Sequence, residues 1–432
     1  MKKLAIIGGG PKAAALCAKA HCLKLAGRQI SVQVFERSRA GAAWTGRSGY
    51  TDGEQRLCTP PERDVGFPYG RGLLDSNGVQ ELFRLFSWQS FLVASGGAAH
   101  SYRDWVDRGR KPPSHALYAE YVKWVIERAS FRRTRGKVVH LTRRDRKWSV
   151  RSIHPVTKRE TVTEGFDGVV VTGPGPAMQG FERPDHPRIT DGVRFWRDPN
   201  GFLSQAEGRE EPIVIAGSGG TSAAIAAWIA RHVPANRPIL ILGNQAALFT
   251  RTESFFENAL FSDEDAWSAL QPDVRVSVSQ RLNRGVVWAS VSDILSSCPN
   301  VRFRPGRVKR ATVSPATEAT PEELSVEVRD AQGDRIDEAS LLIDAAGFDA
   351  WWFAKLLPQR LRRAAEASGA LDCETVRRNL AAGMSDDLSL NIGSPGLHAP
   401  MLSLAQGPGF ASLMVLGAMS ERILQSYVEP VT

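Results

Sequence analysis

Two stretches of the chain share one pattern of hydrophobic, small and polar positions. Each begins with a short apolar run, continues through a glycine-rich turn and ends in an alanine-rich stretch. They are Leu4–Ile7, Gly8–Ala13 and Ala13–Ala26, and, about halfway along the chain, Pro212–Ala216, Gly217–Ser222 and Ala223–Arg231. A short apolar run bounded by a turn predicts a buried strand, and the alanine-rich stretch predicts a helix. The sequence therefore predicts two strand–turn–helix units.

Both turns follow a Gly-x-Gly-x-x-Ala/Ser pattern. Small residues in such a turn let the backbone approach a pyrophosphate, which lies at the N-terminus of the following helix. We expect the first nucleotide site to include Gly8, Gly10, Pro11 and Ala13, and the second to include Gly217, Gly219, Thr221 and Ser222. The alternative is that both turns only allow a helix and a strand to pack tightly.

The two nucleotide sites differ in the residue at the end of the strand that follows each helix. In the first unit that residue is Glu36, 28 residues after Gly8. An acid there accepts hydrogen bonds from a ribose 2′-hydroxyl and repels a 2′-phosphate, which fits FAD or NAD. In the second unit the strand Ile239–Leu242 leads to the uncharged Asn244, and Arg251 follows. An arginine near an uncharged residue suits a 2′-phosphate, so we expect FAD at the first site and NADPH at the second.

The order of predicted strands suggests how the two units are combined. Gly168–Val171 reads as a strand that returns to the first nucleotide site, whereas Leu341–Asp344 reads as another that stops at a glycine. We predict an α/β protein with two Rossmann-like domains, in which an NADPH domain (205–335) is inserted into a split FAD domain (1–175 and 336–432).

Composition narrows the functional classes. The 432 residues are 42 % hydrophobic and 23 % charged, which is typical of a globular protein with a substantial core. The net charge is +9, but the arginine-rich runs 132–135 and 143–147 flank strand-like segments without an aromatic stacking pattern. We expect solvated surface there and no nucleic-acid partner. Since no apolar run approaches ~20 residues, we expect no membrane span and a cytoplasmic location.

Several kinds of catalytic site are missing from the sequence. The five cysteines include no Cys-x-x-Cys pair, which argues against a disulfide reductase. Cys17, His21 and Cys22 lie close together, but no further ligands accompany them, so we expect no metal site. No His-Glu-x-x-His or Gly-x-Ser-x-Gly motif is present. The missing triad fits a reaction that needs no protein side chain as a covalent nucleophile.

Several longer motifs resemble one family of flavoenzymes. They are Trp44, Gly49–Gly53, Pro61–Tyr69, Ser87–Ser90, Phe249–Arg251, Phe255–Asn258 and Gln406–Phe410. Together they resemble the flavin-dependent N-hydroxylating monooxygenases, which hydroxylate lysine or ornithine side-chain amines for hydroxamate siderophores, and in particular the mycobactin-type lysine N-oxygenases. The resemblance covers essentially the whole chain.

The resemblance implies roles for individual residues. It places Trp44 near the flavin ring, Arg63 on the substrate carboxylate, Asn258 on the amino-acid end of the substrate and Arg251 on the NADPH 2′-phosphate. It also implies that Gly347 lies at the cofactor and that Gly409 and Phe410 belong to a C-terminal turn that closes over flavin and substrate. Each side chain also has a structural alternative, such as core packing for Trp44, a surface ion pair for Arg63 and a cap for Asn258.

Two positions depart from the family pattern. Arg63 replaces the motif lysine that holds the substrate carboxylate, and Cys58 replaces a glutamine that many ornithine hydroxylases have near the flavin. An arginine can bind a carboxylate bidentately, although its reach differs from that of lysine. The amine therefore stays open among lysine, acyl-lysine and ornithine, and between a free and a carrier-bound substrate.

The resemblance implies NADPH- and O₂-dependent N-hydroxylation of a primary side-chain amine through a C4a-hydroperoxyflavin, in siderophore or related natural-product biosynthesis. It also implies a homo-oligomer. Alternatives are another flavin monooxygenase of the Baeyer–Villiger or sulfur-oxidising type, a reductase that serves a partner protein, and a non-catalytic flavin-binding protein. Phe181, His186 and Trp196 do not have the spacing of the Baeyer–Villiger linker motif.

Overall fold

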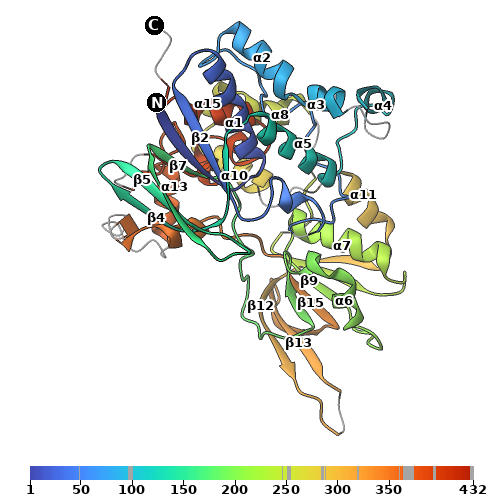
Figure 1. Ribbon diagram of the computed structural model, residues 1–432. Helices are drawn as coiled ribbons and strands as arrows, with labels where there is room; N and C mark the ends of the chain where they lie inside the picture. Colours follow the sequence, from blue (N-terminus) through green and yellow to red (C-terminus); the bar gives the residue numbers. More distant parts are fainter. Residues whose placement is uncertain are drawn as a thin grey trace.

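The computed structural model describes most of the chain, namely residues 1–47, 49–95, 101–245, 247–250, 254–283, 287, 289–318, 321–359, 361–362, 374–392 and 396–428. Two parallel five-stranded sheets dominate these residues, one in the upper and one in the lower body of Figure 1. Along the ranges just given, no helix is long and apolar enough to cross a membrane.

The first sheet has the order β16-β7-β1-β2-β3, and all its strand pairs are parallel. Its strands are β1 (Lys2–Ile7), β2 (Ile30–Glu36), β3 (Arg132–Arg135), β7 (Gly168–Val171) and β16 (Leu397–His398). The central strand β1 is almost completely buried from Leu4 to Ile7, as expected for a parallel sheet covered on both faces. Helix α1 (Pro11–Leu25) follows β1 and packs against α5 (His115–Arg128) and α15 (Leu416–Leu424).

The second sheet has the order β11-β10-β9-β15-β8, again parallel. Its strands are β8 (Ile189–Asp191), β9 (Ile213–Ala216), β10 (Ile239–Gly243), β11 (Val301–Pro305) and β15 (Leu341–Asp344). Helix α7 (Gly220–His232) follows β9 and packs against α11 (Ala289–Ser297). The sheet thus takes strands from 189–344, on both sides of the range 205–335. Because all its strands lie in the chain between β7 and β16, the second sheet is an insertion within the first, which confirms the predicted α/β architecture.

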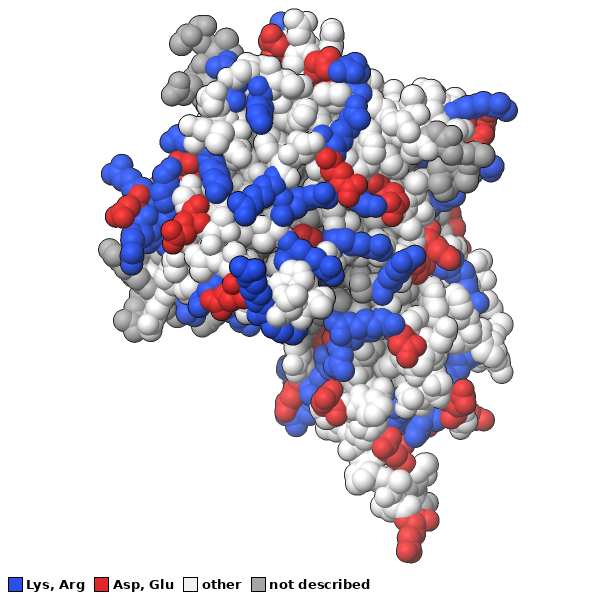
Figure 2. Space-filling view, viewed as in Figure 1, with Lys and Arg blue, Asp and Glu red and all other residues white. Residues whose placement is uncertain are grey.

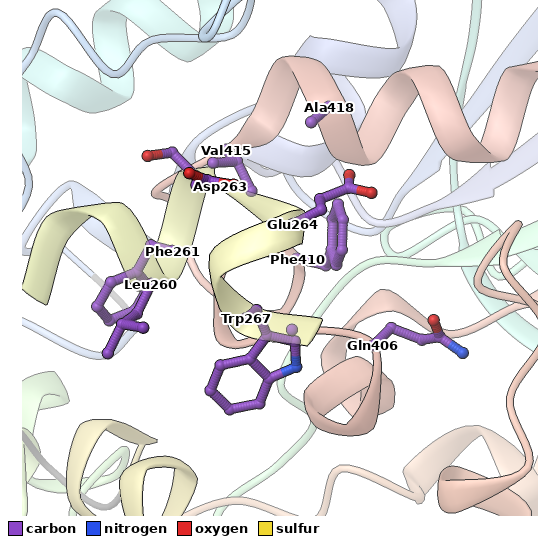
Figure 3. A pocket seen from close by; sticks show the side chains of 11 residues that line it. Leu260, Phe261, Asp263, Glu264, Trp267, Gln406, Phe410, Val415 and Ala418 are labelled. Atoms are coloured by element: carbon purple, nitrogen blue, oxygen red, sulfur yellow. The ribbon is translucent and has the colours of Figure 1, made fainter. Parts of the chain in front are cut away.

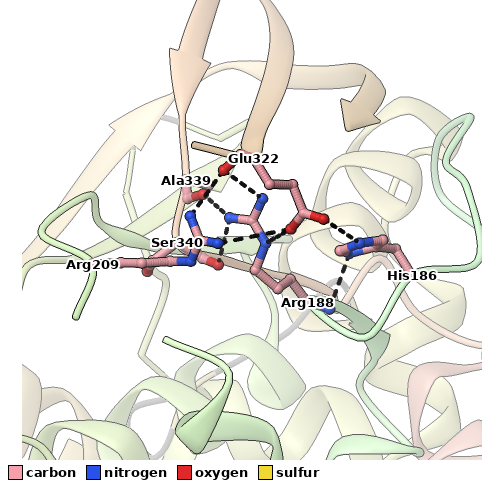
Figure 4. Close-up of polar contacts among 6 residues, drawn as sticks. All are labelled: His186, Arg188, Arg209, Glu322, Ala339 and Ser340. Carbon is pink, nitrogen blue, oxygen red and sulfur yellow. Dashed lines mark hydrogen bonds and ion pairs between the residues drawn. The ribbon is translucent and has the colours of Figure 1, made fainter. Parts of the chain in front are cut away.

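A buried arginine fixes strand β8 at the edge of the second sheet. Arg188, immediately before β8, donates from Nε to Glu322 Oε1 over 3.0 Å and from Nη1 to the carbonyl oxygens of Ala339 and Ser340, each over 3.3 Å. Arg209 donates to the Glu322 carbonyl over 2.9 Å, and His186 Nε2 lies 3.4 Å from Glu322 Oε2 (Figure 4). These contacts join the segment before β8, where the chain enters the second unit, to the segment before β15, the last strand of that sheet.

The remaining strands form two antiparallel three-stranded sheets. They consist of β4 (Lys137–Arg144), β5 (Lys147–Ile153) and β6 (Glu160–Phe166), and of β12 (Arg307–Ser314), β13 (Glu323–Asp330) and β14 (Gly333–Glu338). The arginine-rich runs lie on β3, β4 and the β4–β5 turn. Figure 2 shows basic side chains interspersed with acidic ones on this face of the molecule.

The other helices are short and mostly surround the first sheet. They are η1 (Ala42–Trp44), α2 (Ser76–Phe86), α3 (Trp88–Ser95), α4 (Tyr102–Asp107), η2 (Phe195–Arg197), α6 (Pro199–Ser204), α8 (Phe255–Ser262), α9 (Glu264–Ser268), α10 (Pro272–Asn283), η3 (Trp352–Leu356), α13 (Glu374–Ala382), η4 (Pro400–Ala405) and α14 (Pro408–Ala411).

Candidate active site

The first glycine turn joins β1 to α1 and leaves the start of the helix open. Gly8 has a φ of +102°, and a Cβ there would lie 2.6 Å from Thr172 Oγ1, so only glycine fits. Gly10 caps α1 without any side-chain hydrogen bond, and a Cβ on it would meet nothing within 4 Å. Pro11 occupies the first turn, where its missing N–H costs nothing. The turn therefore has the open backbone cradle that a pyrophosphate needs.

Glu36 lies beside this turn, at the end of β2. Its Oε2 accepts a hydrogen bond from the Gly9 N–H over 2.7 Å, and its Oε1 accepts one from the Ser38 N–H over 2.9 Å. A carboxylate has about four acceptor positions, so capacity for a ribose hydroxyl remains. The structure brings Glu36 to the turn that the sequence predicts it to serve, and Ala13 is buried in the first turns of α1.

The second turn joins β9 to α7 in the same way. Gly217 has a φ of +140°, and a Cβ there would lie 2.4 Å from the carbonyl oxygen of Ala345. Gly219 caps α7 without a side-chain hydrogen bond. The Ser222 hydroxyl donates to the Gly219 carbonyl over 2.8 Å, whereas Thr221 is half-buried in the first turn of the helix.

Gly347 and Arg251 complete the predicted second site. Gly347 follows β15 with a φ of +115°, and its carbonyl accepts a hydrogen bond from the Met178 N–H over 2.9 Å. Its neighbour Phe348 packs edge-to-face on Tyr50, with ring centroids 4.8 Å apart. Gly347 thus lies where the first unit meets the second. Arg251 lies outside the described residues, and Asn244 is exposed at the end of β10.

Trp44 lies half-buried in η1 against helix α5. Its ring packs edge-to-face on His115, with centroids 4.8 Å apart, and contacts Tyr118 with centroids 6.0 Å apart. His115 is buried, and among the described residues its Nδ1 has no hydrogen-bond partner. Burial lowers the pKa of His115 to about 4, so the imidazole is neutral near pH 7. Trp44 is therefore fixed by core packing on one side.

A buried carboxylate shapes the loop that carries Arg63. Asp64 Oδ1 accepts hydrogen bonds from the Gly66 N–H over 3.0 Å and the Tyr69 hydroxyl over 2.7 Å, and Oδ2 accepts one from the Trp88 N–H over 2.8 Å. Burial raises the pKa of Asp64 to about 6, although these hydrogen bonds act to lower it. The sequence places Asp64 in a motif but does not reveal this structural role.

Arg63 itself is half-buried and points toward the C-terminal part of the chain. Its Nη1 donates to the carbonyl oxygen of Met414 over 3.3 Å, and its guanidinium carbon lies 4.7 Å from the ring centroid of Phe67. A guanidinium carries five N–H donors in a planar fork, a geometry that matches a carboxylate bidentately.

Asn258 lies on α8, which packs against α14. The helix begins at Ser254, whose hydroxyl accepts a hydrogen bond from the Glu257 N–H over 3.1 Å, so Ser254 and not Asn258 is the N-cap. Asn258 is half-buried. A Cβ on Gly409 would lie 2.1 Å from the Phe261 carbonyl oxygen, which shows how closely the C-terminal segment approaches α8.

The sequence is similar over its full length to named enzymes. It is 36 % identical to the L-lysine N6-monooxygenase MbtG of Mycobacterium sp. (strain MCS), with 98 % of this chain and 94 % of that protein covered. The MbtG of Mycolicibacterium paratuberculosis is 34 % identical, with 100 % and 96 % covered. The chain belongs to the L-lysine N6-monooxygenase family. This membership confirms the resemblance seen in the motifs, although no model of a known protein family matches the sequence.

Solved structures agree with membership of the lysine N6-monooxygenase family. The lysine monooxygenase NbtG from Nocardia farcinica superposes with a TM-score of 0.79 at 29 % identity, covering 98 % of both chains. The ornithine N-hydroxylase KtzI from Kutzneria sp. 744 superposes with a TM-score of 0.71 at 14 % identity, again covering 98 % of both chains, which shows a shared fold.

Two buried lysines of this chain are features that sequence reasoning missed. Lys12 and Lys19 lie on α1 and are 4 % and 5 % exposed, a degree of burial that is rare for lysine. Lys12 Nζ donates to the carbonyl oxygens of Phe410 over 2.7 Å and Ser412 over 2.8 Å. Lys19 Nζ donates to the Gly417 carbonyl over 2.8 Å and lies 2.6 Å from Glu421 Oε2. Lysines within an otherwise apolar helix are the signal that would have revealed them.

Phe410 is buried next to a small pocket. The pocket lies between α8 and α9 on one side and the C-terminal segment on the other, and Phe261, Trp267, Gln406 and Phe410 contribute to its lining (Figure 3). The Arg422 guanidinium lies 4.7 Å from the Phe410 ring centroid. Phe410 therefore anchors the segment that the resemblance places over the flavin.

The cysteines of α1 are poor nucleophiles. Burial raises the pKa of Cys17 and of Cys22 to about 12, so both remain thiols near neutral pH. Cys58 is half-buried in the loop before Arg63. No group of three metal-ligating side chains occurs within the described part of the chain.

Proposed function

We propose that this protein uses FAD, NADPH and O₂ to hydroxylate the side-chain nitrogen of lysine or a closely related amine. The observation that carries the proposal is the meeting of Arg63 with the C-terminal segment that is attached to the flavin-type helix α1. Full-length similarity to L-lysine N6-monooxygenases supports it. The solved relatives are described with an NADPH domain and with FAD and NADP⁺.

The residues of both turns fit the two cofactors. In the proposal, the open cradle at Gly8 and Gly10 holds the FAD pyrophosphate on α1, with Glu36 on the ribose and Trp44 beside the ring. Gly217, Gly219, Thr221 and Ser222 hold NADPH on α7, with Gly347 beside them. When bound, the reduced flavin supplies an electrophilic oxygen atom from O₂.

The protein's own residues bind and orient the amine. Arg63 holds the substrate carboxylate, and Asn258 contacts the amino-acid end, so the distal nitrogen is directed toward the flavin. That nitrogen must be neutral to attack, yet a lysine ammonium has an ordinary pKa of about 10.4. A closed site near the Arg63 cation lowers that pKa, because both desolvation and a like charge disfavour the ammonium form.

The proposal places the reaction in hydroxamate siderophore or related natural-product biosynthesis in the cytoplasm. Lysine is favoured over its decarboxylated analogue cadaverine because Arg63 has a carboxylate to bind only in lysine. An N-acyl lysine or a carrier-bound lysine differs from free lysine at the amino-acid end, which is the part of the substrate that Arg63 and Asn258 contact in this proposal.

The test is NADPH oxidation by the FAD-loaded protein with lysine, N-acyl lysines, ornithine and cadaverine, with hydroxylamine and peroxide measured together. We expect hydroxylamine in proportion to NADPH for a lysine-type amine. Arg63→Met should raise the KM for lysine about 30-fold or more, because a charged hydrogen-bonded pair is lost, while cadaverine changes little. Peroxide without hydroxylamine for every amine, or equal loss for lysine and cadaverine, would contradict the proposal.

A further inference from the structure

The side chain of Lys12 attaches the C-terminal segment 407–415 to the flavin-type helix α1. Lys12 lies in the first turn of α1, directly after Pro11, and its Nζ donates to the carbonyl oxygens of Phe410 and Ser412. The side chain is buried, and within the described part of the chain it has no carboxylate partner. One ammonium group therefore fixes the positions of two carbonyls that belong to the same short turn.

The same segment reaches Arg63 through a continuous path of hydrogen bonds. The Ser412 hydroxyl donates to the Gly409 carbonyl over 2.9 Å and accepts from the Met414 N–H over 3.1 Å. The Met414 carbonyl in turn accepts from Arg63 Nη1. A path from Lys12 to Arg63 thus runs through Ser412 and Met414.

The third contact of the segment is with the helix that carries Asn258. Gly409 packs so closely on the Phe261 carbonyl that any side chain at position 409 would overlap it. Phe261 belongs to the same helix as Asn258, one turn further along. Segment 407–415 is therefore in contact with the flavin-type helix, with Arg63 and with the helix that carries Asn258.

We infer that Lys12 is a positioning residue, which fixes segment 407–415 on the flavin helix so that Arg63 and Asn258 take up their substrate-binding geometry. The inference rests on the proposed function for the identity of the substrate, but the mechanical link from Lys12 to Arg63 does not depend on it.

The energetics of burial favour this role over simple packing. Burying an ammonium costs free energy that an apolar side chain of similar length would not, so a methionine would fill the same space with less penalty. Burial lowers the pKa of Lys12 to about 7, which reflects that cost. What lysine adds is two directed hydrogen bonds, one to the short helix α14 and one to the residue that follows it.

A matched pair of variants separates positioning from stability. Lys12→Met and Lys19→Met remove the same group from the same helix at the same depth, but Lys19 holds Gly417 and Glu421, and Gly417 meets the Arg63 loop further along, at Gly66 and Phe67. In the FAD-loaded protein, Lys12→Met should raise the KM for lysine about tenfold and increase the share of NADPH that yields peroxide, with kcat changed less than about twofold. Lys19→Met should lower thermal stability and leave that KM within about twofold.

Amide hydrogen exchange gives a readout that is independent of activity. Lys12→Met should speed exchange about tenfold in residues 408–415 and also in residues 62–64, whereas Lys19→Met should leave residues 62–64 unchanged. Faster exchange in both variants alike, or no change near Arg63 in Lys12→Met, would overturn the inference. If the wild type hydroxylates no amine, the proposed function fails, and the exchange pattern still decides the link.

Ser412→Ala provides the second variant, in case Lys12→Met does not fold. It removes the hydroxyl between the Gly409 carbonyl and the Met414 N–H and leaves Lys12 in place. We expect a smaller rise in the lysine KM, about threefold, with faster exchange in residues 62–64. An unchanged KM together with unchanged exchange would overturn the inference.

Discussion

Helices α1 and α7 follow equivalent glycine turns but hold different parts of the chain. Lys12 and Thr221 each lie four residues after the first glycine of their turn, and Lys19 and Trp228 each lie eleven residues after it. The two lysines bind backbone carbonyls of the C-terminal segment. Trp228 instead packs edge-to-face on Phe195, with centroids 5.6 Å apart. The turn specifies a nucleotide, whereas the body of the helix specifies which other segment lies beside it.

The largest effects should come from the first glycine of each turn. Gly8→Ala and Gly217→Ala each combine a positive φ with a Cβ that would lie 2.6 Å or less from a neighbouring atom, so we expect each to destabilise its unit by about 2–6 kcal/mol. Gly8→Ala should lose FAD. Gly217→Ala should retain FAD and lose NADPH binding. Flavin absorbance per protein and urea unfolding measure both effects.

A third glycine provides the control for that pair. Gly27 has a φ of +80°, but a Cβ there would meet nothing within 4 Å. Gly27→Ala should therefore cost only about 1 kcal/mol and keep both cofactors. Loss of FAD from Gly27→Ala as complete as from Gly8→Ala would show that backbone strain, and not the contact with Thr172, makes Gly8 necessary.

A second, smaller effect should come from His115 in the first unit, as a change in the free energy of unfolding with pH. The pKa of His115 is about 4 in the folded protein and about 6.5 when unfolded, so between these values the unfolded chain binds more protons. The free energy of unfolding should therefore fall as the pH drops from 6.5 to 4, by about 3 kcal/mol in total. His115→Phe should flatten this slope in urea unfolding followed at several pH values.

Asp64 changes stability in the opposite direction and serves as the internal comparison. Its pKa is raised to about 6, so between pH 4 and 6 the folded state binds more protons than the unfolded state. Asp64→Asn should therefore steepen the loss of stability on acidification that His115→Phe flattens. Parallel slopes in the two variants would contradict the assignment of these groups.

The smallest effect is expected at Thr221, the counterpart of Lys12. Thr221→Val keeps the methyl group that approaches Gly192 but removes the hydroxyl from the start of α7. We expect the KM for NADPH to rise about two- to tenfold, because one hydrogen bond to a phosphate is lost. The KM for lysine and the FAD content should not change in steady-state kinetics and flavin titration. A change in lysine KM would show that the two helices are less distinct than their contacts indicate.

Local pattern was sufficient to predict the elements around both nucleotide turns. The glycines at 8, 10, 217 and 219 and the acid at 36 lie where the spacing predicts, because a strand, a tight turn and a helix are specified by neighbouring residues. The predicted roles of Trp44, Arg63 and Asn258 in binding stay predictions, as do the domain boundaries.

Contacts between distant residues could not be predicted in this way. Lys12 and Phe410 are 398 positions apart, and nothing near either residue indicates the other. The edge strand β8 and its neighbour β15 likewise gave no local sign that they pair with each other in the second sheet. A hydrophobic pattern predicts that a strand is buried but leaves its neighbour unspecified.

The two chain segments that connect the sheets run antiparallel to each other. Ala177 bridges to Phe348, the Met178 N–H donates to the Gly347 carbonyl, and the Asp349 N–H donates to the Pro176 carbonyl over 3.0 Å. The 170 or so residues between them therefore begin and end at one point. The second unit is therefore a module that enters and leaves the first at neighbouring positions. A different nucleotide-binding unit inserted between Ala177 and Phe348 would leave the strands of the first sheet in their present order.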